Sequence, residues 1–254
     1  MSLYLDYNAS APIALAALDA MMAVYQHRIG NADSRTHIYG DQARAAVETA
    51  RKQAAFLLGV STAEVFFTSG ATESDNIAIQ GLTACVAIQL LSFSAHKMRG
   101  SQGIGGLVLR KRSYKLPPVQ AIMCGGQQER GLRPGIIPTA LAAGCGAACA
   151  LAETNYAEDA RKLREIEALL LGLIGASGLR HTIHGDPRWR MPNTLSLCLH
   201  GISSEALMIA TKQYCAVSNG SACISTNYAP SYVLTAMGLP ADQIESTIRI
   251  SWGA

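Results

Sequence analysis

The segment from Ser92 to Lys97 places two serines, a histidine and a lysine at the end of a short apolar stretch and before glycine-rich residues. A lysine amine that is shielded from water can lose its proton and form a Schiff base, and adjacent Ser and His side chains can bind a cofactor phosphate. The alternative is a solvated loop in which Lys97 is an ordinary surface lysine and His96 caps a carbonyl. On its own, the segment leaves both possibilities open.

The turn from Ser69 to Thr72 lies between a predicted strand and a predicted helix. Free N–H groups and the dipole at a helix N-terminus attract anions, so the turn could hold a phosphate. The alternative is an ordinary helix cap formed by Ser69 or Thr72, with Glu73 in the first turn. The motif alone favours the cap.

A cysteine and an arginine in the last part of the chain are two further candidates. Cys223 lies in the Ser- and Gly-rich stretch SNGSACIS (218–225), where a thiolate would be accessible as a nucleophile. Arg249 is flanked by Ile248 and Ile250 in a strand-like stretch. It either points to solvent or pairs with an anion such as a substrate carboxylate.

Composition excludes several classes of protein. The 254 residues are 49% hydrophobic and 15% charged, which predicts a packed core, and the net charge of +3 without long runs of one sign predicts no direct binding of nucleic acid. The longest apolar stretch, 85–93, is too short to span a membrane. No secretory signal is recognised at the start of the sequence, and the seven cysteines include no C-x-x-C pair, which favours a reducing, cytoplasmic setting.

The remaining cysteines occur mostly among apolar or small residues, and we expect them to pack as small hydrophobic side chains. They are Cys85, Cys124, Cys145, Cys149, Cys198 and Cys215. Cys145 and Cys149 are four residues apart in an Ala- and Gly-rich run, which favours packing on one helix face. No metal site is predicted, because no histidine or second cysteine pair lies nearby.

The elements that position these residues alternate between helices and strands, which predicts an α/β fold. In the first part of the chain, helices are expected at 12–28 and 41–58 and strands at 64–68, 90–94 and within 103–112. A long helix is expected from Pro134 to about Leu173. Beyond it we expect strands at 180–184 and 193–199, a helix at 203–212 and a strand-like end at 246–254.

Taken in order, the segments resemble the NifS-like, group I cysteine desulfurases of the class V aminotransferase superfamily, which are pyridoxal-phosphate (PLP) enzymes of fold type I. The resemblance is carried by nine colinear stretches, a combination far more specific than any single motif. They include YLDYNASAP (4–12), EVFFTSGATESDNIAIQG (64–81), LLSFSAHKMRGSQGIGGLVLR (90–110), GGQQERGLRPG (125–135), SNGSACIS (218–225) and STIRISWG (246–253).

The resemblance implies two domains. Residues 13–155 would form a large α/β PLP-binding domain with a mainly parallel sheet. Residues 1–12 and 156–254 would form a small α+β domain. The resemblance also assigns site residues by their positions in the matching stretches: Lys97 as the Schiff-base lysine, Cys223 as the sulfur acceptor, Arg249 as the ligand of the substrate carboxylate, and Ala71, Thr72, Ser94 and His96 around the cofactor phosphate.

The activity implied by the resemblance is conversion of L-cysteine to L-alanine, with the sulfur left as a persulfide on Cys223 for a protein acceptor. A homodimer is implied, because the stretch 125–135 forms part of the partner's site in the family. Iron–sulfur cluster assembly, tRNA thiolation and DNA phosphorothioation are all open as destinations of the sulfur. The stretch SNGSACIS (218–225), which contains Cys223, disfavours an aminotransferase or a selenocysteine lyase.

The sequence departs from the family in one large respect. Only 24 residues lie between Thr72 and Lys97, where the family has several further β/α units, so the fold is expected to be internally truncated. The missing segment normally contacts the cofactor ring, and the resemblance therefore assigns no residue here to the ring. Ile136 replaces a common threonine, and the chain ends at Ala254, short of the family's C-terminal helical part.

Three explanations of the short segment are open: a truncated gene product, a degenerate relative, and a sequence from which a stretch of a longer chain is missing. The alternative function is that of a catalytically inactive relative that binds a sulfur-transfer partner. Retention of both Lys97 and Cys223 argues against that alternative.

Overall fold

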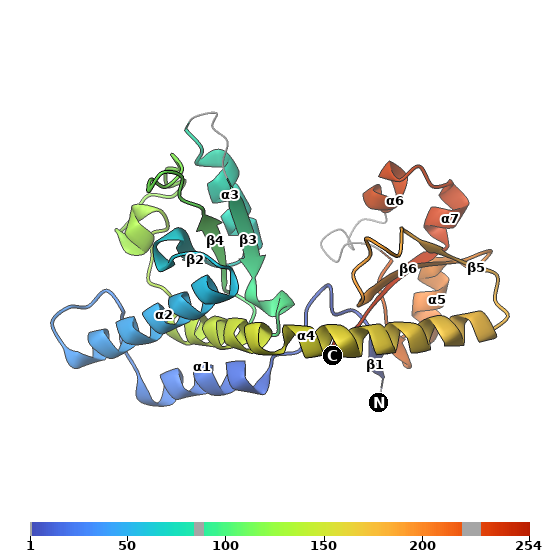
Figure 1. The fold of residues 1–254 in the computed structure, drawn as a ribbon, viewed down its shortest axis with the longest axis horizontal. Coiled ribbons are helices and arrows are strands. Elements are labelled where there is room, and N and C mark those ends of the chain that lie inside the picture. Colours follow the sequence, from blue (N-terminus) through green and yellow to red (C-terminus); the bar gives the residue numbers. More distant parts are fainter. Residues whose placement is uncertain (1, 84–88, 220–229) are drawn as a thin grey trace. The chain divides into compact units, whose positions relative to one another are not determined.

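The computed structural model describes residues 2–83, 89–219 and 230–254, which form two compact units (Figure 1). The central unit is Pro12–Asn155, and the terminal unit combines Met1–Ala11 with Tyr156–Ala254. A long helix, α4 (Thr139–Ala176), begins in the central unit and continues into the terminal unit.

The central unit is built on a three-stranded sheet in the order β2-β4-β3. The strands are β2 (Val65–Thr68), β3 (Leu90–Ser94) and β4 (Gly105–Leu109), and β4 pairs antiparallel with both neighbours. Alternate side chains point to opposite faces, as the two-residue repeat of a strand requires. Phe67 and Val108 join a core with α2 (Ile38–Leu57) and the start of α4, whereas Phe66 and Leu107 pack against α3 (Ala71–Gln80).

Small residues let the helices of the central unit approach one another closely. Helix α1 (Leu15–His27) packs through Ala17 against Ala148 of α4. A side chain at Gly146 would collide with Ala50 of α2, with only 2.5 Å between the added Cβ and the Cα of Ala50. Cys145 and Cys149 are fully buried in this core, which confirms their predicted packing. A hydrogen bond with Cys149, together with burial, raises the pKa of the Cys145 thiol well above its ordinary value.

Charged side chains cover the outer edge of β2. Arg51 donates from both terminal nitrogens to Glu129, at 2.6 and 2.8 Å, and both side chains are buried. The Glu129 carboxylate also accepts a 2.6 Å hydrogen bond from the backbone N–H of Phe67. The carbonyl oxygen of Val65 accepts hydrogen bonds from Arg51 and Arg130, each at 2.8 Å. On the free edge of β2, the N–H of Phe67 and the carbonyl of Val65 are therefore paired with side chains rather than with another strand, and the N–H of Val65 donates to the carbonyl of Thr62.

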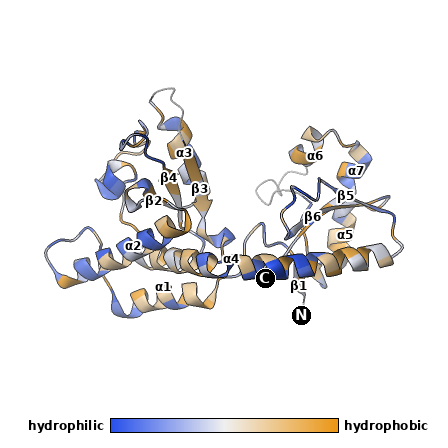
Figure 2. Cartoon of the chain, viewed as in Figure 1, coloured by the Kyte–Doolittle hydropathy of each residue, from blue (hydrophilic) through white to orange (hydrophobic). Residues whose placement is uncertain are grey.

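The terminal unit contains an antiparallel sheet in the order β5-β6-β8 and a short parallel pair. Its strands are β5 (His181–His184), β6 (Thr194–Leu199), β8 (Thr247–Ser251), β1 (Leu3–Tyr4) and β7 (Cys215–Ala216). The sheet core packs against α5 (Ser204–Thr211) and the apolar side chains of later α4, while the charged stretch 158–165 of α4 is hydrophilic in Figure 2. Two short helices, α6 (Tyr232–Ala236) and α7 (Ala241–Glu245), precede β8.

The helices and strands expected from the sequence are present, but the expected strand direction, the packing of one cysteine and the start of one helix are wrong. The mainly parallel sheet is not found among the described strands, because β4 lies antiparallel between β2 and β3. Cys124 is exposed rather than packed in a core, and Cys85, for which packing was also expected, lies outside the described residues. In addition, the long helix begins at Thr139 instead of Pro134. Among the described residues, no helix combines the length and the apolar character that a bilayer crossing requires.

Candidate active site

The turn between β2 and α3 lies beside the end of β3, because both strands flank β4. The N-cap of α3 is Gly70, whose φ of +155° belongs to a region that only glycine populates readily. The next backbone N–H, that of Ala71, donates a 2.8 Å hydrogen bond to the hydroxyl oxygen of Ser94, a residue only 8% exposed. β4 passes directly beneath the turn, so a Cβ at Gly105 would lie 2.7 Å from the Cα of Gly70. The Gly70 turn and Ser94 are thus fixed to each other.

The predicted cap of α3 by Ser69 or Thr72 is wrong. Gly70 caps the helix without a side-chain hydrogen bond, while the N–H of Ser69 donates at 2.6 Å to the carboxylate of Glu73. Glu73 also accepts a 2.9 Å hydrogen bond from Arg133. Burial by itself would raise the pKa of Glu73, but the hydrogen bonds from Arg133 and Ser69 outweigh it and hold this pKa below its ordinary value. The Glu73 carboxylate is therefore charge-paired.

Hydrogen-bond donors for an anion remain at this helix end. The first N–H groups of a helix have no acceptor within the helix, and the described residues offer none to those of Thr72 and Glu73. The Ser94 hydroxyl accepts from Ala71 through its oxygen and can donate its own hydrogen elsewhere. These donors fit the oxygens of a phosphate group.

His96 and Lys97 follow Ser94 directly, in the 3₁₀ turn Ala95–Lys97. The turn is held by a hydrogen bond from the N–H of Ala95 to the carbonyl of Ile104, at 3.1 Å. Burial lowers the pKa of His96, and the positive charge of Lys97 lowers it further, so the imidazole is neutral at neutral pH. The side chain of Lys97 is exposed. The described residues therefore do not give its amine the shielding from water that a Schiff-base lysine requires.

Arg249 lies in the terminal unit, on β8, and it pairs with an anion. Its terminal nitrogen donates a 2.8 Å hydrogen bond to the carboxylate of Asp6. Its backbone exchanges two hydrogen bonds with Ser218, at 2.5 and 3.1 Å. Ser218 precedes the stretch 220–229, and Cys223 lies in that stretch, outside the described residues. Sequence reasoning gave Asp6 no role, although the residue belongs to the YLDYNASAP stretch that carried the resemblance.

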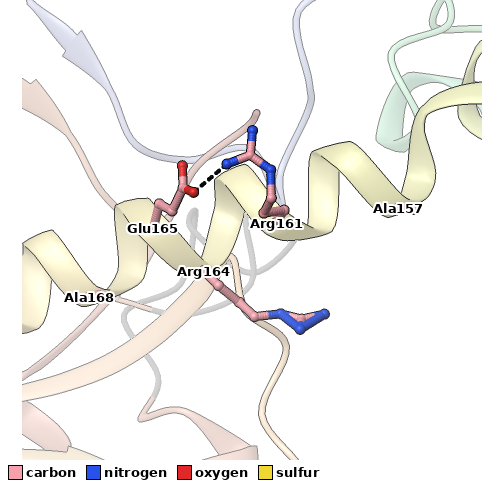
Figure 3. Close-up of a pocket in the computed structure, with 5 residues that line it drawn as sticks. All are labelled: Ala157, Arg161, Arg164, Glu165 and Ala168. Atoms are coloured by element: carbon pink, nitrogen blue, oxygen red, sulfur yellow. Dashed lines mark hydrogen bonds and ion pairs between the residues drawn. The ribbon is translucent and has the colours of Figure 1, made fainter.

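A depression on the surface of α4 does not qualify as a site. Its lining residues are Ala157, Arg161, Arg164, Glu165 and Ala168, all from one helix. Arg161 and Glu165 form an ion pair with each other, and Arg164 points away from them (Figure 3). Charged side chains that pair with each other on an exposed helix face are an ordinary solvated surface.

The amino-acid sequence of the chain matches the model of a known protein family. The model of the aminotransferase class-V family matches residues 3–87 and 83–254, which together cover nearly the whole chain. The chain belongs to the aminotransferase class-V family. Within this class-V family it is similar to cysteine desulfurases of the IscS and NifS kind, as the sequence resemblance predicted.

Two curated relatives illustrate this similarity. The class-V chain is 29% identical to a cysteine desulfurase of Rattus norvegicus over 356 positions, covering 99% of the chain and 78% of the relative. It is 30% identical to the cysteine desulfurase IscS of Anaeromyxobacter sp. (strain Fw109-5) over 359 positions, covering 99% of the chain and 87% of the relative. A solved structure of a NifS-like protein superimposes with a TM-score of 0.87 at 23% identity, covering 100% of the chain and 94% of that structure. This superposition shows the shared fold.

The class-V chain is shorter than these relatives inside the aligned region. The alignment with the rat enzyme runs over 356 positions, about a hundred more than the 254 residues of the chain. The two stretches matched by the family model meet at residues 83–87, between α3 and β3. The extra positions of the relatives are therefore expected at this junction. It lies within the 24 residues between Thr72 and Lys97, where the sequence is shorter than the family pattern.

Proposed function

We propose that this chain is a PLP-dependent cysteine desulfurase that converts L-cysteine to L-alanine and transfers the sulfur to Cys223. The observation that carries the proposal is the hydrogen bond between Ala71 and Ser94, which brings the N-terminus of α3 to the turn that holds His96 and Lys97. A phosphate-binding helix end and a lysine at one edge of a sheet suit a PLP enzyme. Similarity to cysteine desulfurases supports the choice of reaction.

The proposal assigns a role to each domain. Residues 13–155 form the PLP-binding domain, and residues 1–12 with 156–254 form the small domain that carries Arg249 and Cys223. The division of the chain into the central and terminal units supports this assignment. The mixed α/β fold shared with NifS-like proteins supports it as well.

The phosphate of the cofactor would be held by the N–H groups at the start of α3, by the hydroxyl of Ser94 and by the side chains of Thr72 and His96. Because Arg133 neutralises Glu73, the phosphate does not meet an unpaired carboxylate at the helix end. A neutral His96 can donate one hydrogen bond from its protonated ring nitrogen to a phosphate oxygen and accept one at its other ring nitrogen. PLP, when bound, withdraws electrons from the substrate's α-carbon and so makes the α-proton acidic.

The chain's own residues then divide the remaining tasks. Lys97 would attach the cofactor and move the α-proton through its Nζ atom, and Arg249 would orient the substrate by its carboxylate. The Cys223 thiolate would attack the substrate sulfur, so that the new S–S bond forms as the carbon–sulfur bond breaks. The products balance as alanine and a persulfide on Cys223. An outside thiol then takes the sulfur and restores the free cysteine.

The Gly70 turn provides a direct test of cofactor binding. We expect Gly70→Ala to weaken PLP binding by a factor of about ten or more, because the native φ is strained for any side chain and the new Cβ would lie 3.3 Å from the Ser94 hydroxyl oxygen. Absorbance titration with PLP measures the dissociation constant. Gly172→Ala is the control, since a Cβ on this helical glycine meets nothing within 4 Å. Equal affinities in both variants would place the phosphate elsewhere.

The function itself is tested by incubating the purified chain with PLP, L-cysteine and a reducing thiol. We expect alanine to accumulate, and mass spectrometry to find one added sulfur on the peptide that contains Cys223. Cys223→Ser should abolish both signals, whereas Cys124→Ser, which changes an exposed cysteine of the central unit, should preserve them. Alanine formation that survives Cys223→Ser would remove this residue from the mechanism.

A second function remains a candidate because relatives carry about a hundred further positions and Lys97 is exposed. In that case the chain would be an inactive relative that binds a sulfur-transfer partner. Absence of alanine from the wild-type chain with PLP would favour it. The homodimer, the protein acceptor of sulfur, the cytoplasmic location and a role in iron–sulfur cluster assembly are further parts of the lead proposal.

A further inference from the structure

The N-terminal segment of the terminal unit is bound along both of its sides. The N–H of Leu5 donates to the carbonyl of Ala216 at 2.9 Å, and the carbonyl of Leu5 accepts from the N–H of Ser251 at 2.8 Å. The side chain of Asn8 donates to the hydroxyl of Thr194 at 2.9 Å. Asp6 lies between these attachments, so its backbone is fixed against the end of β8.

The fixed backbone directs the Asp6 carboxylate onto Arg249. One carboxylate oxygen accepts from one terminal nitrogen at 2.8 Å, and the two side chains are only 18% and 26% exposed. A charge-assisted hydrogen bond that is partly shielded from water is stronger than an exposed ion pair. The Nε atom of Arg249 is buried without a partner among the described residues. The guanidinium is thus held in one orientation although one of its donors is unpaired.

We propose that Asp6 is a positioning residue, which holds the guanidinium of Arg249 in the orientation that receives the carboxylate of L-cysteine. This inference rests on the proposed function. An arginine side chain has several rotatable bonds, and fixing it in advance reduces the entropy lost when the substrate binds. Asp6 uses only one terminal nitrogen, and a guanidinium has five N–H donors, so others remain for the substrate.

The backbone of Arg249 also connects β8 to the segment that precedes Cys223. The backbone of Arg249 is bonded in both directions to Ser218, which precedes the stretch containing Cys223. Arg249 is therefore bonded through its side chain to Asp6 and through its backbone to Ser218, the first residue of the stretch 218–225. Because Asp6 acts on the group that binds the substrate carboxylate, we expect its loss to raise the KM for L-cysteine with little change in kcat.

The first experiment measures steady-state kinetics of the PLP-loaded chain. We expect Asp6→Ala to raise the KM for L-cysteine about tenfold, with kcat within about twofold of the wild type. Asp6→Asn should recover much of the loss, because an amide oxygen can still accept from Arg249. Asp186→Ala is the control, since it removes an exposed Asp–Arg pair of the same unit. Circular dichroism checks that each variant is folded.

The second experiment separates positioning from general damage. Cysteamine is L-cysteine without its carboxylate, so its inhibition constant should be the same in Asp6→Ala and the wild type. Calorimetric binding of L-alanine, which keeps the carboxylate, should weaken about tenfold in the variant. Equal weakening toward cysteamine and L-alanine would overturn the inference, because it would indicate a merely structural role.

Two further outcomes also decide the matter. An unchanged KM in Asp6→Ala would overturn the inference, and so would a lower KM, which would mean that Asp6 competes with the substrate for Arg249. In both cases an active wild type leaves the proposed function standing. No alanine formation by the wild type would overturn the proposed function and, with it, the role of Asp6.

Discussion

Lys97→Ala is expected to lower the rate of alanine formation from L-cysteine by a factor of about 10³ or more. The change removes the only amine of the Ser92–Lys97 stretch, and with it both the attachment of the cofactor and the group that moves the α-proton. The 3₁₀ turn at Ala95–Lys97 keeps its main-chain hydrogen bonds in this variant, such as those from the N–H groups of Met98 and Gly100 to the carbonyl of Ala95. The fold should therefore be retained.

The measurement is alanine formed per minute at saturating PLP, together with the PLP retained after gel filtration. Lys115→Ala, which removes another exposed lysine of the central unit, should behave as the wild type in both respects. If Lys97→Ala kept more than about a tenth of the activity, a different amine would have to serve, and the assignment of Lys97 would be abandoned.

Glu129→Ala is expected to lower the free energy of unfolding by about 3–5 kcal/mol. Glu129 is buried, pairs with Arg51 and accepts a hydrogen bond from the N–H of Phe67. Its removal would leave a buried guanidinium and a buried strand N–H without their partner. Burial by itself would lower the pKa of Arg51, but the hydrogen bond and the charge of Glu129 outweigh burial and raise it.

Urea unfolding followed by circular dichroism measures this loss. Glu158→Ala is the matched control, because it removes an exposed carboxylate that pairs with Arg161 on the surface of α4, and its midpoint should equal that of the wild type. A double variant, Arg51→Met with Glu129→Leu, should recover part of the stability, since apolar side chains of similar size can replace a buried ion pair. A midpoint unchanged by Glu129→Ala would mean that the edge of β2 is not held in this way.

Local patterns predicted the elements of the central unit but not the directions of its strands. The apolar stretches at 64–68, 90–94 and 103–112 indicate strands because short β-rich runs are bounded by glycine and serine. Side-chain periodicity is the same for a parallel and an antiparallel strand, so it did not show that β4 runs opposite to β2 and β3. The two-residue strands β1 and β7 are too short to leave a pattern.

The candidate site was predictable where the decisive contact is local, and unpredictable where it is distant. Ser69 and Thr72 looked like helix caps, but the N–H of Ala71 is bonded by Ser94 from another strand, 23 residues further along the chain. Asp6 and Arg249 are 243 residues apart, so no spacing rule could join them. The alternatives for Arg249, solvent or an anion, could be decided only once the bridge between Asp6 and Ser251 placed the first segment of the chain beside β8.

The buried cysteines provide a natural reporter for each unit of the fold. Cys145 and Cys149 are fully buried in the core of the central unit, and Cys198 is fully buried in the terminal unit. Burial raises the pKa of Cys198, and the Cys145 pKa is raised as well, so neither thiol reacts readily while its unit is closed. An alkylating reagent would reach them only during transient opening, whereas it would label Cys124 at once. A single labelling time course would therefore measure how often each unit opens, separately and without an engineered probe.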